Sequence, residues 1–88
     1  MHSRFIVLDV ETTGVNPAVD DIIEIAIVRI DIEGNVLDRF EALCSTPLPI
    51  TPLVTSLTGI TPADLEGKTN FRDIASEVSE FIGTEVGS

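Results

Sequence analysis

The stretch FIVLDVETTG, from Phe5 to Gly14, ends an apolar run with two carboxylates. Side chains alternate along a strand, so Asp9 and Glu11 share one face and lie roughly 6.5–7 Å apart. The residues before them are apolar on both faces, which is typical of a strand that is covered on both sides. Unpaired charge at the end of a buried strand is costly. We therefore expect a ligand or partner that compensates these two acids.

The residues that follow predict a small antiparallel sheet. Arg4–Glu11 is the first strand, and the β-branched residues of Ile22–Ile30 indicate a second. Glu33-Gly34-Asn35 is typical of a tight turn, which leads into a third strand over Val36–Cys44. The three strands together form a predicted antiparallel meander.

Helices follow the sheet. Thr51, placed before a proline, is a helix start and Gly59 is a stop, and residues 61–64 repeat this opening signal. Asn70 is a good N-cap for a last helix, and Gly83 suits the position just after its end. The apolar stripe of this helix comprises Phe71, Ile74, Ala75, Val78, Phe81 and Ile82. The predicted class is α/β. One helix covers only one face of a sheet, so the sheet looks unfinished.

The acidic composition limits the kinds of molecule that the chain can bind. The 88 residues carry 15 acidic and 5 basic side chains, a net charge of −10, so the chain repels phosphate backbones unless cations or a basic partner intervene. The first apolar run is too short for a secretion signal or a membrane span. Cys44 is the single cysteine, so no internal disulfide is possible, and we expect its side chain to fill the core. We also expect a cytoplasmic protein that has no membrane partner. We assign His2 no catalytic role.

The acid pair predicts a metal site. Close like charges repel unless a cation joins them, and hard carboxylate oxygens suit Mg²⁺ or Mn²⁺. Two such ions stabilise both the attacking and the leaving oxygen in phosphoryl displacement. The Thr-Thr-Gly turn after Glu11 would let backbone N–H groups approach a ligand closely. A D-x-E at a strand end is more often a solvated terminus, and this alternative stays open at this point.

For two further groups of acidic residues, a structural interpretation is preferred to a functional one. Glu24 interrupts the second strand; it could support the metal ligands, but a charge at the start of the strand is the preferred interpretation. The neighbours Asp20 and Asp21 are more typical of a solvated loop than of a ligand group.

The motifs FIVLDVETTG, IIEIAIV and LTGIT, followed by a helix ending in FIG, resemble the DEDD or DnaQ-like 3′–5′ exonucleases. This family includes the epsilon proofreading subunit of bacterial replicative polymerases. The LTGIT element is more similar to the exonuclease domains of Gram-positive-type polymerases and of helicase-fused DinG-like proteins. The resemblance implies an RNase H-like fold, with a mixed five-stranded sheet whose first three strands form the meander.

The resemblance also implies roles for six positions, which are Asp9, Glu11, Thr12, Thr13, Leu57 and Thr58. The two acids match the first two of four acidic ligands for two Mg²⁺ or Mn²⁺ ions. The threonines of the turn match positions that contact the terminal nucleotide, Thr12 largely through its backbone. Leu57 and Thr58 match a segment that packs against the terminal base and sugar, where many relatives have His instead of Thr58. The implied substrate is the 3′ end of a single-stranded nucleic acid, with a polymerase or helicase as partner; DNA is the preferred interpretation, and RNA stays open as the alternative.

The chain departs from the family at its end. Family members continue into a strand with Asn and Asp and then into a motif with the general base and a fourth Asp, and residues 84–88 contain neither. We therefore expect residues 1–88 to be the N-terminal portion of a single exonuclease domain that lacks the fourth and fifth strands and is inactive alone. The alternative is a non-catalytic acidic module that pairs through the exposed edge of its first strand.

Overall fold

The computed structural model describes residues 4–16 and 18–86, with side chains up to residue 83. His2, which was assigned no catalytic role, lies outside the described residues. Three strands, β1 (Arg4–Thr12), β2 (Ile22–Asp31) and β3 (Val36–Leu43), form an antiparallel sheet in the order β1-β2-β3. The predicted meander is confirmed, and each predicted strand boundary is within one residue of the observed one.

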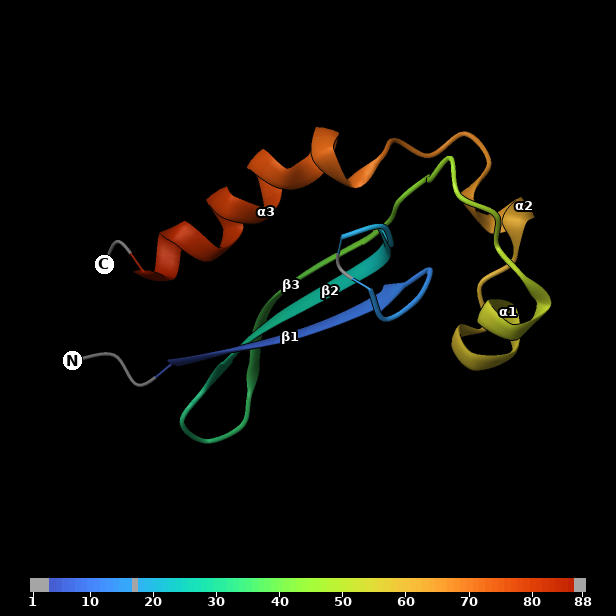
Figure 1. Cartoon of the computed structure of the whole chain (residues 1–88). Helices are drawn as coiled ribbons and strands as arrows, with labels where there is room; N and C mark the ends of the chain where they lie inside the picture. The colour runs from blue at the N-terminus through green and yellow to red at the C-terminus, as the bar shows by residue number, and fades with distance from the viewer. Residues whose placement is uncertain (1–3, 17, 87–88) are drawn as a thin grey trace.

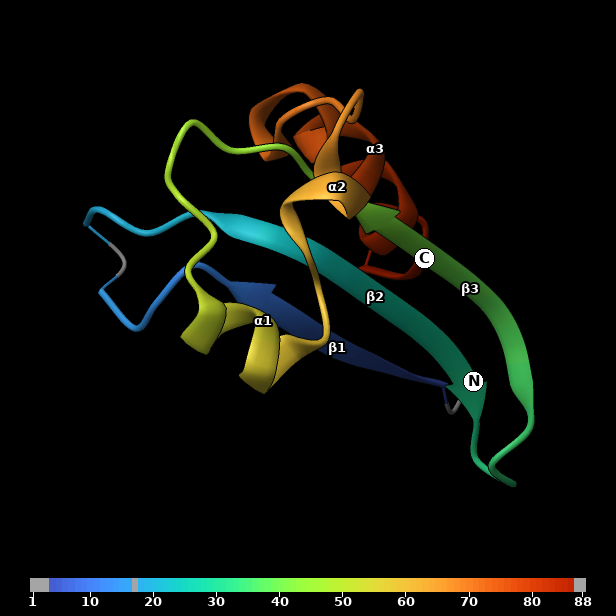
Figure 2. The same cartoon turned by 90° about the vertical axis from the view of Figure 1, so that its right-hand side faces the viewer.

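The helices are α1 (Pro52–Thr58), α2 (Pro62–Leu65) and α3 (Phe71–Val86). Helix α3 runs along the sheet, whereas α1 and α2 lie at the end of the sheet away from the β2–β3 hairpin (Figure 1; Figure 2). The predicted caps are confirmed for the short helices: the Thr51 hydroxyl accepts the Val54 N–H at 3.2 Å, and Thr61 and Asp64 form a reciprocal capping box. Helix α1 ends at Gly59, whose φ of 79° lies in the left-handed region that glycine tolerates best.

The predicted end of the last helix is wrong. Asn70 does cap α3, because its side-chain oxygen accepts the Asp73 N–H at 2.9 Å. The helix then continues through Gly83 to Val86. A glycine inside a helix costs only about 1 kcal/mol relative to alanine, so its local stop signal is easily overridden.

Two apolar clusters form the core. The first lies between the sheet and α3 and contains Ile25, Ile27 and Val78, and the second joins Ile23 to the α1–α2 region. Cys44 is fully buried, as expected for a core residue, and burial raises the pKa of its thiol. Within the described ranges, no helix is both long and apolar enough to cross a membrane.

The predicted coverage of the first strand on both faces is wrong for this structure. β1 is an edge strand, and the central position belongs to β2. Phe5 and Val7 on one face and Leu8 on the other are each 50–54% exposed. The apolar pattern of the strand carries no information about the number of neighbouring strands, and with β2 as its one neighbour in the sheet these side chains stay half-exposed.

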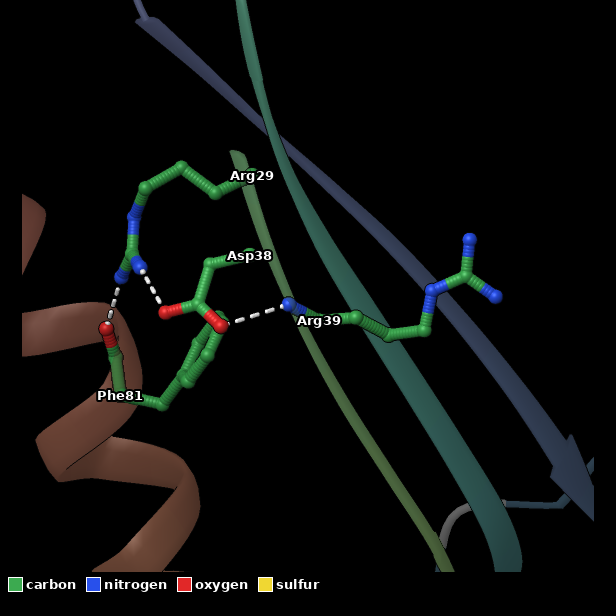
Figure 3. A network of polar contacts seen from close by, with 4 residues as sticks. All are labelled: Arg29, Asp38, Arg39 and Phe81. Atoms are coloured by element: carbon green, nitrogen blue, oxygen red, sulfur yellow. Dashed lines mark hydrogen bonds and ion pairs between the residues drawn. The ribbon is translucent and has the colours of Figure 1, made fainter. Parts of the chain in front are cut away.

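A buried cation connects the sheet to α3. The Arg29 side chain donates to the Asp38 carboxylate at 3.0 Å and to the Phe81 carbonyl, and its guanidinium carbon lies 4.3 Å from the centre of the Phe81 ring (Figure 3). The second carboxylate oxygen of Asp38 accepts the Arg39 N–H, while the Arg39 side chain points away from this network (Figure 3). These contacts fix the position of the last turns of α3 on β2 and β3.

Candidate nucleic-acid and metal site

The two acids lie on one face of β1. Asp9 is opposite Ala26 and Glu11 is opposite Glu24 in the antiparallel register, which becomes irregular only after Glu11. The residues of β1 and β2 that pack against α3, such as Ile6 and Ile25, belong to the other face. The acid pair therefore lies on the side of the sheet that α3 leaves uncovered.

More carboxylates share this face. Glu24 lies directly across from Glu11, and Glu41 on β3 lies across from Ala26, the residue opposite Asp9. Like charges directly opposite each other destabilise a sheet, and a divalent cation would relieve that repulsion. The oxygen donors present therefore fit Mg²⁺ or Mn²⁺. Among the side chains that the structure describes, in residues 4–16 and 18–83, no three or more of His, Cys, Asp and Glu cluster closely enough to hold a metal.

The turn after Glu11 is held by its own polar contacts. The Thr13 hydroxyl donates to the Asp20 carboxylate at 2.8 Å and accepts the Asp21 N–H at 3.0 Å. The Thr13 N–H donates to the Asp21 carbonyl at 2.9 Å. Asp21 in turn accepts the Thr46 hydroxyl at 2.6 Å, which connects the turn to the segment after β3. Asp20 and Asp21 were interpreted as a solvated loop, and the structure gives them the role of organising this turn.

Most of the predicted site residues line the same cavity. It has a volume of about 490 Å³ and lies between the end of β1, the turn that follows it, and α1. Five of the six predicted residues line it, namely Glu11, Thr12, Thr13, Leu57 and Thr58. Asp9 is not among the lining residues and lies two positions earlier on β1. Residues that are 46 positions apart in the sequence, such as Glu11 and Leu57, thus border the same space.

The cavity wall is more apolar than the sequence motifs suggested. Leu57 is 75% exposed and shares the wall with Leu53, Val10 and Val15, which are also exposed. The sequence motifs gave no role to these last three residues, because their exposure and common position are known only from the fold. Such a surface can pack against a flat, partly apolar group such as a nucleobase.

The threonine hydroxyls of the site are already engaged within the protein. Thr12 donates to the Gly14 carbonyl, and Thr13 is held by Asp20 and Asp21. The Thr58 hydroxyl donates to the Val54 carbonyl at 2.8 Å and accepts the Ile60 N–H at 3.1 Å. These three hydroxyls, like the Thr13 N–H, are thus engaged in contacts within the protein.

A family model described as an exonuclease (RNase_T) matches residues 6–87. The chain is 38% identical over 86 residues to a PolC-type DNA polymerase III from Halalkalibacterium halodurans, covering 98% of this chain and 6% of the polymerase. It is 42% identical over 81 residues to the PolC-type polymerase of Thermotoga maritima, covering 92% of this chain and again 6% of the relative. The chain therefore spans only a small part of the polymerases that it matches.

The chain is also similar to solved structures of an exonuclease. The structure of E. coli exonuclease I in complex with a dT13 oligonucleotide has a TM-score of 0.75 and 30% identity, covering 90% of this chain and 18% of that one. A product-bound structure of exonuclease I has a TM-score of 0.76 and 31% identity, covering 92% of this chain and 20% of that one. The predicted α/β, RNase H-like fold class is confirmed by this similarity.

Proposed function

This chain belongs to the exonuclease family, as its motifs predicted, and from that premise we propose that the protein containing it removes nucleotides from the 3′ ends of single-stranded DNA. The observation that carries the proposal is the cavity in which Glu11 of the acid pair, the Thr12–Gly14 turn and Leu57 lie together. The dT13 oligonucleotide bound to exonuclease I supports DNA as the substrate class. We further propose a role in replication in the cytoplasm, which the polymerase relatives support.

We assign the two acids to metal binding. Asp9 and Glu11 would hold Mg²⁺ or Mn²⁺, and in the complete site two such ions would activate the attacking water and stabilise the leaving oxygen. The antiparallel ladder between β1 and β2 keeps both carboxylates on one face without help from the turn. Glu24, directly across from Glu11, adds negative charge that favours a cation at this position.

The cavity would orient the end of the strand. Leu57 and the neighbouring valines would pack against the terminal base, a contact that every base can make because each has an apolar face. The backbone of the turn at Gly14, where no side chain intervenes, would approach the nucleotide closely. Orientation of this kind brings the scissile bond to the acid pair and contributes much of the rate enhancement in such reactions.

The acidic charge of the chain must be overcome for DNA to bind. With a net charge of −10, the isolated chain repels phosphates, and divalent cations at the acid pair would offset only part of this. We therefore propose that a basic polymerase or helicase module accompanies the domain. DNA binding by the complete protein would then weaken steeply with salt.

Nuclease assays on the full-length protein test this function. Asp9→Asn or Glu11→Gln is expected to lower kcat by roughly three orders of magnitude or more with Mg²⁺, because the members of such a site act as a unit. Asp73→Asn, which removes an exposed carboxylate from the start of α3, is the matched control and is expected to retain activity. Undiminished hydrolysis by the Asp9 variant would refute the assignment.

We also propose that these 88 residues alone are inactive, or nearly so. Two acidic ligands on one strand are a partial set, and no third candidate ligand joins them in the part of the chain that the structure describes. Degradation of single-stranded DNA by the purified chain at a rate near that of the full-length protein would contradict this.

A second candidate function is that of an acidic interaction module. The exposed edge of β1, with half-exposed Phe5, Val7 and Leu8, favours it, since an unpaired strand can recruit a strand from another chain. Light scattering after size exclusion tests this: dimers that disappear with Val7→Lys would support the module, and a monomer at high concentration would exclude self-pairing.

A further inference from the structure

We propose that Asp20 is a positioning residue that holds the Thr13–Gly14 turn in the shape that accepts the terminal nucleotide. This inference rests on the proposed exonuclease function. Asp20 does not itself line the cavity, but Thr13 and Gly14 do. It therefore acts from behind the cavity wall, through the turn.

The carboxylate of Asp20 makes two contacts across the turn. One oxygen accepts the Thr13 hydroxyl at 2.8 Å, and the other accepts the Asn16 N–H at 3.0 Å. Because the Thr13 hydroxyl also accepts the Asp21 N–H, its own proton is directed toward Asp20. Hydrogen bonds to a charged acceptor are stronger than those between neutral groups, so this carboxylate is well suited to fix the two ends of the turn.

Gly14 is packed directly against this carboxylate. A Cβ atom on Gly14 would lie 2.5 Å from one Asp20 oxygen and 2.9 Å from the other, far inside normal contact distance. The absence of a side chain at Gly14 thus lets Asp20 approach the backbone that forms the cavity wall. A side chain at Gly14 would therefore displace the Asp20 carboxylate from the turn.

The acid pair is held in a different way. Asp9 and Glu11 are in regular register with Ala26 and Glu24, so the strand ladder, and not Asp20, sets their position. Loss of Asp20 is therefore expected to weaken nucleotide binding while leaving metal binding and the chemical step largely intact.

Kinetics and binding of the full-length protein test the inference. For Asp20→Ala, we expect KM for single-stranded oligothymidylate to rise about tenfold, corresponding to one lost hydrogen bond to a charged group, with kcat changed less than about threefold. The Kd for a fluorescein-labelled oligothymidylate with a phosphorothioate 3′ end, measured by anisotropy, should rise by the same factor. The Mn²⁺ concentration that gives half-maximal activity should stay unchanged.

Further variants separate positioning from general destabilisation. Gly14→Ala is expected to raise KM similarly in the parent protein, but to add less when Asp20 is already Ala, because the atoms that clash are gone. Asp20→Asn keeps one carbonyl oxygen for Thr13 and should recover part of the affinity. Glu33→Ala removes an exposed carboxylate from the distant β2–β3 turn and is the control, with KM and kcat expected at parent values.

The alternatives give different results. A fall in kcat with KM and Kd unchanged would mean that Asp20→Ala only lowers the fraction of folded enzyme, and the inference would be overturned. Fully additive effects of Gly14→Ala and Asp20→Ala would overturn it too. If the parent protein neither bound nor degraded the oligonucleotide, the proposed function itself would fail, which is a distinguishable outcome.

Discussion

We expect Asp38→Ala to reduce the free energy of unfolding by about 2 kcal/mol, whereas Glu41→Ala on the same strand reduces it by less than about 1 kcal/mol. Both residues are exposed and pair with an arginine, Asp38 at 3.0 Å and Glu41 at 3.2 Å. The difference lies in the arginines: the side chain of Arg29 is 8% exposed, and that of Arg39 is 57% exposed. The two variants thus compare a half-buried ion pair with a solvated one at nearly equal distance.

The magnitude follows from Coulomb's law. With an effective dielectric constant of 20, charges about 3.0 Å apart attract by about 5.5 kcal/mol, and in water at about 3.2 Å by about 1.3 kcal/mol. Desolvation offsets much of the first value, and because Asp38 is 56% exposed we expect a net contribution of about 1–3 kcal/mol. Side-chain ordering and salt screening reduce the second to about 0.2–1 kcal/mol. The contacts of Arg29 with Phe81 persist in the variant and keep the loss below that of a fully isolated charge.

Urea unfolding followed by circular dichroism measures both losses, at low salt and in about 0.5 M NaCl, where the Debye length is only a few ångströms. We expect the Glu41 effect to vanish with salt and most of the Asp38 effect to remain. Asp38→Asn separates the charge from the neutral hydrogen bond, since an amide oxygen can still accept the Arg39 N–H. Equal losses for the two alanine variants, or complete screening of the Asp38 effect, would refute the argument from burial.

Two further predictions concern acid and thiol chemistry. The pKa of Asp31 is lowered chiefly by the Asn35 backbone N–H and then by the Asn35 side chain, so its contribution to stability is complete above its unfolded pKa of about 3.9 and is lost as the pH falls through its lower folded value. Asp31→Asn should therefore flatten the loss of stability between about pH 5 and pH 3 in urea titrations, and an unchanged slope would contradict this. Burial raises the pKa of Cys44, so its reaction with a thiol reagent at pH 7 should be at least about a hundredfold slower in the folded chain than in urea, and equal rates would show that the core opens freely.

Local signals were sufficient for the strands and for the starts of the helices. Strand alternation, the Glu33–Asn35 turn and the threonine caps of α1 and α2 each depend on residues a few positions apart, and all are observed. The same reasoning failed at Gly83, where the helix continues. A glycine permits a helix end but does not impose one, because right-handed backbone is also open to it.

The sequence by itself determined the order of the strands and helices, the family, and the presence of two carboxylates on one face of the first strand. Only the tertiary structure decided that β1 lies at the edge of the sheet, that Leu57 faces the same cavity as Glu11, and that Asp20 lies against Gly14. The physical reason is the distance along the chain over which each kind of interaction acts. Alternation, capping and turn formation act between neighbours along the chain, whereas edges, cavities and contacts behind a cavity wall arise from the packing of segments that are distant in sequence.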